Sequence, residues 1–161
     1  MNPLTWGEEY NIGLVEIDEQ HREFVNIINK IIRAETEKCP IEFGARLIFE
    51  LLKYAEFHFV CEENLMYRNN YPGYNGQITE HRKLLAIMDT KMREFQSKVA
   101  DYDSIAKFSF MWLISHTVEE DKKFGAFMQI KDKASQRPMN SLQTPRPGNS
   151  TPLATTRPPA P

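Results

Sequence analysis

The chain has 161 residues with 41% hydrophobic and 26% charged residues, which is enough for one domain with a buried core. Its net charge of −2 is uneven, because residues 131–161 hold five of the 20 Lys and Arg but only one of the 22 Asp and Glu. Residues 1–130 therefore carry 15 basic and 21 acidic groups, and such an acidic body argues against a nucleic-acid-binding groove.

The two cysteines, Cys39 and Cys61, form no CxxC pair and are too few for a disulfide scaffold. The N-terminal residues lack the basic and apolar regions of a signal peptide. No apolar run reaches the length of a membrane span. We therefore expect a cytoplasmic monomer that binds neither membrane nor nucleic acid.

Residues 1–17 are expected to form an irregular arm that packs on the domain, because proline and glycine interrupt them. Four later segments show the apolar spacing of amphipathic helices. Asp18 suits the N-cap of the first, Pro40 the first turn of the second, and Asp101 or Asp103 the cap of the fourth. The expected helices run over 18–35, 40–67, 77–100 and 101–130, with a turn at 69–76.

No segment shows the sustained alternation of a β-strand. Four long helices joined by short connections predict an all-α fold, an up-down-up-down antiparallel four-helix bundle over residues 18–130. Such bundles hold metal sites in their cores, with ligands from facing helices.

Residues 131–161 differ in composition and hold seven of the ten prolines. This composition predicts a disordered Pro-rich tail. Two interpretations remain for the tail: a segment that binds an unidentified protein partner, or a solvated extension without one.

The chain has four histidines, one on the apolar stripe of each predicted helix: His21, His58, His81 and His116. A single core histidine is usually a hydrogen-bonded structural residue. Four buried imidazoles instead need a partner that offsets their desolvation, and a metal ion is such a partner.

Two carboxylates accompany these histidines. Glu62 follows His58 by four residues, which places both side chains on one helical face. Asp121 follows His116 by five, so either its side chain reaches sideways or the helix loosens locally; the glutamates at 119 and 120 are alternative acids. Imidazole and carboxylate ligands without thiolate favour iron or manganese over structural zinc, and two carboxylates can bridge two ions.

Four motifs in order along the chain resemble the bacterial hemerythrins: WGEEYNIGLVEIDEQH, HFVCEENLM, NNYPGYNGQITEH and WLISHTVEED. The resemblance extends over about residues 4–130. It implies a non-haem centre of two iron ions, bridged by two carboxylates and an oxo or hydroxo group. It also implies that O2 binds reversibly, as hydroperoxide, at the iron with an open position.

The resemblance further implies a role for each ligand. His21 and His58 correspond to the terminal ligands of the open iron, and Glu62 and Asp121 to the bridging carboxylates.

His81 and His116 correspond to two of the three histidines on the other iron. The third histidine of the family pattern stands four residues before His81, where this chain has Gln77. Gln77 can ligate through its side-chain oxygen, which is a weaker and neutral donor. A water in that position and lost affinity for the second iron are the alternatives.

The expected O2 pocket is lined by Phe59, Trp112, Leu113 and Thr117. Its mostly apolar wall would exclude water and so protect reduced iron. The family usually carries a bulky aliphatic residue at the position of Thr117. A hydroxyl there can hydrogen-bond a bound ligand; the alternative is a helical threonine that bonds its own backbone.

The leading hypothesis is thus an O2-binding di-iron protein with a carrier, storage or sensing role, rather than an enzyme. The alternative is a di-iron redox enzyme, either a peroxidase, an oxidase or a centre that handles nitric oxide, which Gln77 and Thr117 favour. A third possibility is a sensor or delivery module that engages a partner through the tail.

Overall fold

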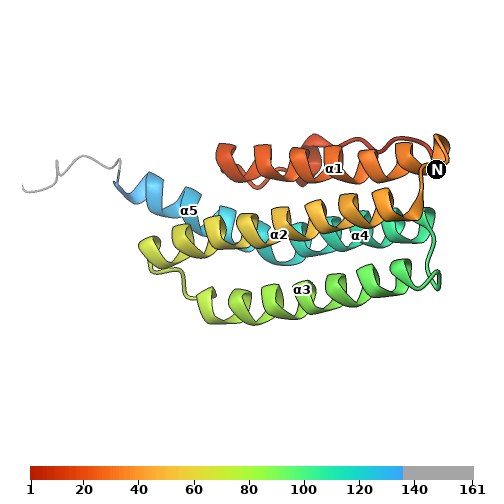
Figure 1. Ribbon diagram of the computed structural model, residues 1–161. Helices are drawn as coiled ribbons and strands as arrows, with labels where there is room; N and C mark the ends of the chain where they lie inside the picture. The colour runs from red at the N-terminus through yellow and green to blue at the C-terminus, as the bar shows by residue number, and fades with distance from the viewer. Residues whose placement is uncertain (136–161) are drawn as a thin grey trace, which may run out of the picture.

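The computed structural model describes residues 1–135, and it contains helices and no strand over that range. The elements in chain order are a 3-10 turn η1 (Glu8–Tyr10), then α1 (Val15–Thr36), α2 (Ile41–Asn69), α3 (Tyr74–Gln96), α4 (Tyr102–His116), a π-helical segment η2 (Thr117–Asp121) and α5 (Lys122–Ser135). Helices α1 to α4 lie side by side, and each runs in the opposite direction to the one before it (Figure 1). The predicted antiparallel four-helix bundle is therefore confirmed.

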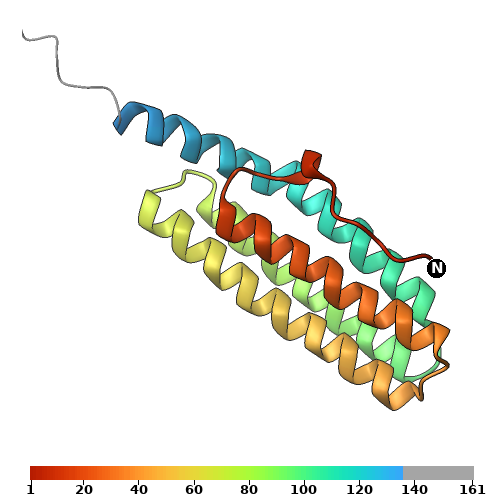
Figure 2. The ribbon, with the colours of Figure 1, turned by 90° about the horizontal axis from the view of Figure 1, so that it is seen from above.

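Three elements, α4, η2 and α5, follow one another as a single long rod, and α5 projects beyond the bundle (Figure 2). This rod corresponds to the fourth predicted helix. Because α5 continues to Ser135, residues 131–135 are helical and not part of an irregular tail. The remainder of the expected tail, and with it the prediction of a tail partner, lies outside the described residues.

The prediction that Asp18 caps the first helix is wrong. Helix α1 begins three residues earlier, at Val15, and Leu14 occupies the N-cap position. The buried Asp18 carboxylate instead accepts hydrogen bonds from the backbone N–H of Ile12 at 2.7 Å and of Gly13 at 3.1 Å. Asp18 therefore ties the arm to α1 from inside the helix.

The cap at Asp101 is confirmed, and it forms a complete capping box with Ser104. The Asp101 carboxylate accepts from the Ser104 N–H at 2.8 Å, while the Ser104 hydroxyl accepts from the Asp101 N–H at 3.1 Å. These two bonds satisfy backbone donors that the first turn of a helix leaves without partners.

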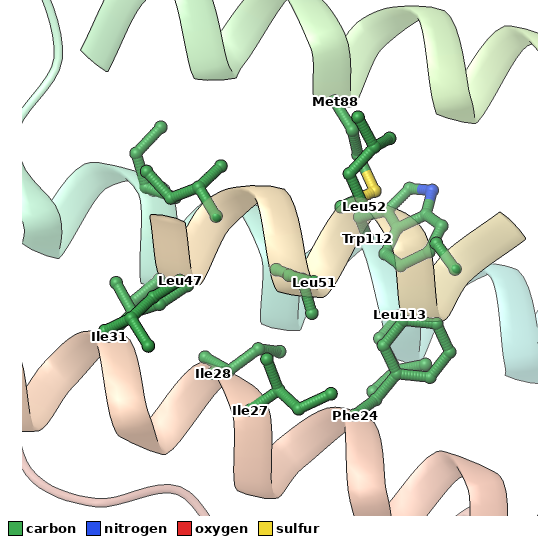
Figure 3. Close-up of a cluster of buried hydrophobic side chains, with 14 of the residues drawn as sticks. Phe24, Ile27, Ile28, Ile31, Leu47, Leu51, Leu52, Met88, Trp112 and Leu113 are labelled. Atoms are coloured by element: carbon green, nitrogen blue, oxygen red, sulfur yellow. The ribbon is translucent and has the colours of Figure 1, made fainter. Parts of the chain in front are cut away.

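The apolar core joins all four helices of the bundle (Figure 3). Its central side chains are Phe24, Ile27, Ile28 and Ile31 from α1, Leu47, Leu51 and Leu52 from α2, Met88 from α3, and Trp112 and Leu113 from α4. Burying each such side chain stabilises the fold by about 1.5–3 kcal/mol. The core thereby holds the four helices in a fixed register.

The N-terminal arm runs along α1 and the α4–α5 rod (Figure 2). The Asn29 side chain of α1 holds it by two hydrogen bonds, one from the Leu4 N–H at 2.8 Å and one to the Leu4 carbonyl at 2.9 Å. Further along, Gly125 of α5 lies directly against the backbone of Ile12. No helix in the described part of the chain has the length and apolar character needed to cross a membrane.

We predict that Gly125→Ala destabilises the protein, because the added methyl group would overlap the Ile12 carbonyl oxygen, which is backbone and cannot rotate away. The expected loss is about 1–3 kcal/mol, measured by urea unfolding. Gly76→Ala in α3 is the control, since nothing lies within 4 Å of its added methyl group. An equal loss in both variants would show that the contact with the arm is not the cause.

Candidate metal centre

All seven side chains predicted as ligands come together at one end of the bundle, away from the turns that join α1 to α2 and α3 to α4. They are buried, and even the most accessible of them, His116, is only 8% exposed. Each bundle helix contributes, with α4 extended by η2: His21 from α1, His58 and Glu62 from α2, Gln77 and His81 from α3, His116 and Asp121 from α4 and η2.

The donor atoms form two overlapping groups. Within each group they lie within 4.8 Å of one another: His21, His58, Glu62 and Asp121 in the first, and Glu62, His81, His116 and Asp121 in the second. Each group thus has its own pair of imidazoles, and both groups share the same two carboxylates. Two carboxylates shared between two pairs of imidazoles would suit two neighbouring metal ions.

A π-helical segment places Asp121 in the cluster. The segment Thr117–Asp121 widens the helix directly after His116, so a residue five positions on returns to the same face. The two Asp121 oxygens lie 3.2 Å from His116 Nε2 and 3.4 Å from His21 Nε2. Of the two possibilities that the sequence leaves open, the structure has the loosened helix.

The alternative acids point elsewhere. Glu119 is exposed and accepts a hydrogen bond from Ser115 at 3.1 Å, and Glu120 pairs with Lys123 at 2.8 Å. Both glutamates therefore belong to the outer face of the rod.

Two of the imidazoles are oriented by hydrogen bonds behind the cluster. His58 Nδ1 lies 2.8 Å from Gln20 Oε1, and His81 Nδ1 lies 2.9 Å from Glu63 Oε1. Because these oxygens only accept, each Nδ1 carries the proton. Each Nε2 then presents its lone pair toward Glu62, at 3.6 Å and 3.5 Å respectively.

Sequence reasoning missed Gln20 and Glu63. Both residues stand next to predicted ligands in the sequence, since Gln20 precedes His21 and Glu63 follows Glu62. Each of them, however, bonds a histidine on another helix: Gln20 contacts His58, and Glu63 contacts His81.

The pKa values of the two shared carboxylates shift in opposite directions. Burial, reinforced by the nearby Asp121, raises the pKa of Glu62 well above its usual range. Burial also opposes the charge of Asp121, but His116 and His21 outweigh it and hold the pKa of Asp121 well below its usual range. Burial and the neighbouring His21 lower the pKa of His58, which keeps that imidazole neutral and able to ligate.

Several buried donor atoms have no hydrogen-bond partner in the described part of the chain: both nitrogens of His21, both oxygens of Glu62, Nε2 of His81 and His116, Oδ2 of Asp121 and Oε1 of Gln77. The 3.2 Å contact between His116 and Asp121 is close but does not satisfy that nitrogen's hydrogen-bond geometry. Leaving such groups buried without partners is costly. Coordination of metal ions would satisfy all of them except one nitrogen of His21, since an imidazole binds an ion through a single nitrogen; the residues present therefore fit a metal centre.

Gln77 stands four residues before His81 on α3, and it is only 2% exposed. Its Nε2 donates to Asp121 Oδ1 at 3.5 Å, while its Oε1 remains without a partner among the described residues. The same Asp121 oxygen lies 3.2 Å from His116 Nε2, so the Gln77 amide is on the His116 side of Asp121, and its Oε1 could bind a metal ion there.

Two of the predicted pocket residues, Phe59 and Trp112, lie beside imidazoles of the cluster. Phe59 stacks on His81 with ring centroids 3.9 Å apart and an angle of 7°. Trp112 lies parallel to His116 at 6.4 Å, and Leu113 is buried in the apolar core. Aromatic rings thus lie beside two of the four imidazoles, His81 and His116.

Thr117 is fully buried, and its Oγ1 has no hydrogen-bond partner within residues 1–135. The interpretation that Thr117 bonds its own backbone is therefore wrong. The π-helical backbone at this position leaves the hydroxyl free for another acceptor or donor.

A helical bundle with a buried cluster of imidazoles and shared carboxylates defines the class of this molecule, a helical-bundle metal-binding protein. The family model described as "Hemerythrin HHE cation binding domain" matches residues 13–128. The chain belongs to the hemerythrin family. Proteins of this family bind a di-iron centre, and the His, Glu and Asp cluster described above is suited to hold it.

Individual relatives agree with this assignment. A bacteriohemerythrin of Clostridium acetobutylicum is 28% identical over 130 residues, which cover 75% of this chain and 98% of that protein. A hemerythrin of Sipunculus nudus is 28% identical over 123 residues, covering 76% of this chain and 92% of the other. A crystal structure of wild-type hemerythrin has the same fold, with a TM-score of 0.68 and 23% identity over 78% of this chain and 97% of the other.

We predict that ferrous iron, added without air, stabilises the metal-free protein, because the ions bind only the folded cluster. Binding at 100 times the dissociation constant contributes about 2.7 kcal/mol, which corresponds to a rise in Tm of roughly 5–10 °C, measured by differential scanning calorimetry. Glu62→Gln removes one shared charge at equal size, and its Tm should rise far less. The same rise in both proteins would mean that the iron binds elsewhere.

Proposed function

We propose that this chain is an O2-binding protein that holds two iron ions in the buried cluster. The observation that supports the proposal best is that Glu62 and Asp121 belong to both donor groups. The hemerythrin family assignment supports the same conclusion independently.

The proposed ligands fall into three sets: His21 and His58 for the first ion, His81, His116 and the Gln77 oxygen for the second, and Glu62 and Asp121 shared between them. The first ion then has one protein donor fewer than the second. We propose that O2 binds at that first ion.

A reduced iron pair, when bound, supplies the electrons that O2 takes up on binding and returns on release. The chain's own residues hold the ions in place and exclude water. Phe59, Trp112 and Leu113 provide an apolar surround, which limits loss of electrons to solvent. The buried Thr117 hydroxyl has no partner among the described residues and would be available to donate a hydrogen bond to bound O2.

The relatives described above do not favour the redox-enzyme alternative that Gln77 and Thr117 raise. A carrier and an enzyme differ in one measurable respect, since a carrier returns O2 unchanged.

We predict that the reduced, iron-loaded protein binds O2 reversibly. Adding O2 should produce an absorption band in the near-ultraviolet and visible range, and flushing with argon should remove it over repeated cycles, measured by optical titration. Glu62→Gln serves as the control and should show no reversible band. Permanent oxidation in the first cycle, with O2 consumed, would contradict the carrier function and support the enzyme.

We also predict that Thr117→Val releases O2 faster, because valine keeps the shape of threonine but donates no hydrogen bond. Loss of about 1 kcal/mol from one hydrogen bond corresponds to a roughly fivefold faster release, measured by stopped-flow mixing with an O2 scavenger. The control is Thr90→Val, whose exposed hydroxyl donates to the Ala86 carbonyl at 3.0 Å. An unchanged rate in Thr117→Val would exclude a contact between this hydroxyl and O2.

A further inference from the structure

The two halves of the cluster differ in the groups behind their imidazoles. His58, in the first half, donates its Nδ1–H to the neutral amide of Gln20 at 2.8 Å. His81, in the second half, donates its Nδ1–H to the carboxylate of Glu63 at 2.9 Å. A hydrogen bond to a charged acceptor is about twice as strong as one between neutral groups, so His81 is held more firmly.

The same half contains the one proposed ligand that is neither an imidazole nor a carboxylate. Gln77 lies one helical turn before His81 and has an amide oxygen without a partner among the described residues, and its Nε2 donates at 3.5 Å to the Asp121 oxygen that lies 3.2 Å from His116. A neutral oxygen is a poorer ligand for iron than imidazole nitrogen. The remaining terminal ligands, His81 and His116, must therefore provide more of the affinity for the second ion.

We propose that Glu63 is a positioning residue that compensates for the amide ligand Gln77, by keeping His81 oriented and strongly donating so that the second metal position stays filled. This inference rests on the proposed function, because it assumes a two-ion centre.

The contacts of Glu63 suit this role. Its side chain is 25% exposed, so its charge is tolerated, yet its Oε1 reaches the buried ring of His81. Glu63 forms no other side-chain hydrogen bond or ion pair within residues 1–135. A negatively charged acceptor hydrogen-bonded to the outer nitrogen raises the basicity of the inner nitrogen and fixes the ring's orientation.

The Phe59 ring also restrains the imidazole of His81, by stacking on its face. It stacks on His81 at 3.9 Å and thereby limits tilting of the imidazole out of line with the cluster. Rotation of the imidazole within its own plane remains, and the Nδ1–H bond to Glu63 opposes that rotation. The two neighbours therefore constrain His81 together.

The experiment is equilibrium dialysis of the full chain against ferrous iron without air, with iron per chain measured at each free concentration. The wild-type protein should bind two ions. Glu63→Gln should bind the first ion normally and the second about 10–100-fold more weakly, which is the usual cost of losing such a partner. Glu56→Gln is the matched control on the same helix, since Glu56 pairs with Lys53 and should not affect either ion.

A second background tests compensation directly. The Gln77→His variant has a third imidazole. Adding Glu63→Gln to it should lower the affinity for the second ion by less than about threefold. Such coupling between the two positions would not arise if Glu63 had only a structural role. Glu63→Asp should restore part of the wild-type affinity, and circular dichroism checks that each variant is folded.

Three results would overturn the inference while leaving two-ion binding intact: an unchanged second affinity in Glu63→Gln, equal weakening of both ions, or the same loss with and without Gln77→His. A wild-type protein that binds fewer than two ions would instead overturn the proposed function, and the inference with it. The two failures are therefore distinguishable.

Discussion

The structure depends on one constraint, the burial of two carboxylates and four imidazoles at one end of an otherwise apolar bundle. Glu62 and Asp121 are fully buried, and several of their oxygens have no hydrogen-bond partner in residues 1–135. Apolar packing cannot offset that cost, because charged groups are poorly solvated in a core. Bound cations can, and they explain why the bundle has a polar end and an apolar end.

The apolar end makes the polar end possible. The side chains from Phe24 to Leu113 shown in Figure 3 set the spacing and register of the four helices. With the register fixed, ligands on four separate helices meet within a few ångströms. The arm adds a cover, since the Trp6 ring packs 5.1 Å from His21 and Asp18 holds the backbone at Ile12 and Gly13.

The two halves of the cluster are similar in plan but unequal in detail. Each has two imidazoles and the same shared carboxylates, yet one imidazole is backed by an amide and another by a carboxylate. The carboxylate supports His81, one helical turn after Gln77, whose amide donates to Asp121. The stronger supporting charge therefore stands beside the neutral amide, and the two occur on the same side of the cluster.

The sequence by itself determined the four-helix bundle, because apolar residues recur at helical spacing in four long segments. It also identified seven polar residues on inward faces, which the structure brings together. Contacts between helices could not be read from it: Gln20 lies 38 residues from His58 and Glu63 lies 18 residues from His81. Only the tertiary structure decided that Asp18 binds the arm, that the helix widens before Asp121, and that Thr117 keeps a free hydroxyl. These features depend on which groups meet across the fold, and helical periodicity carries no information about that.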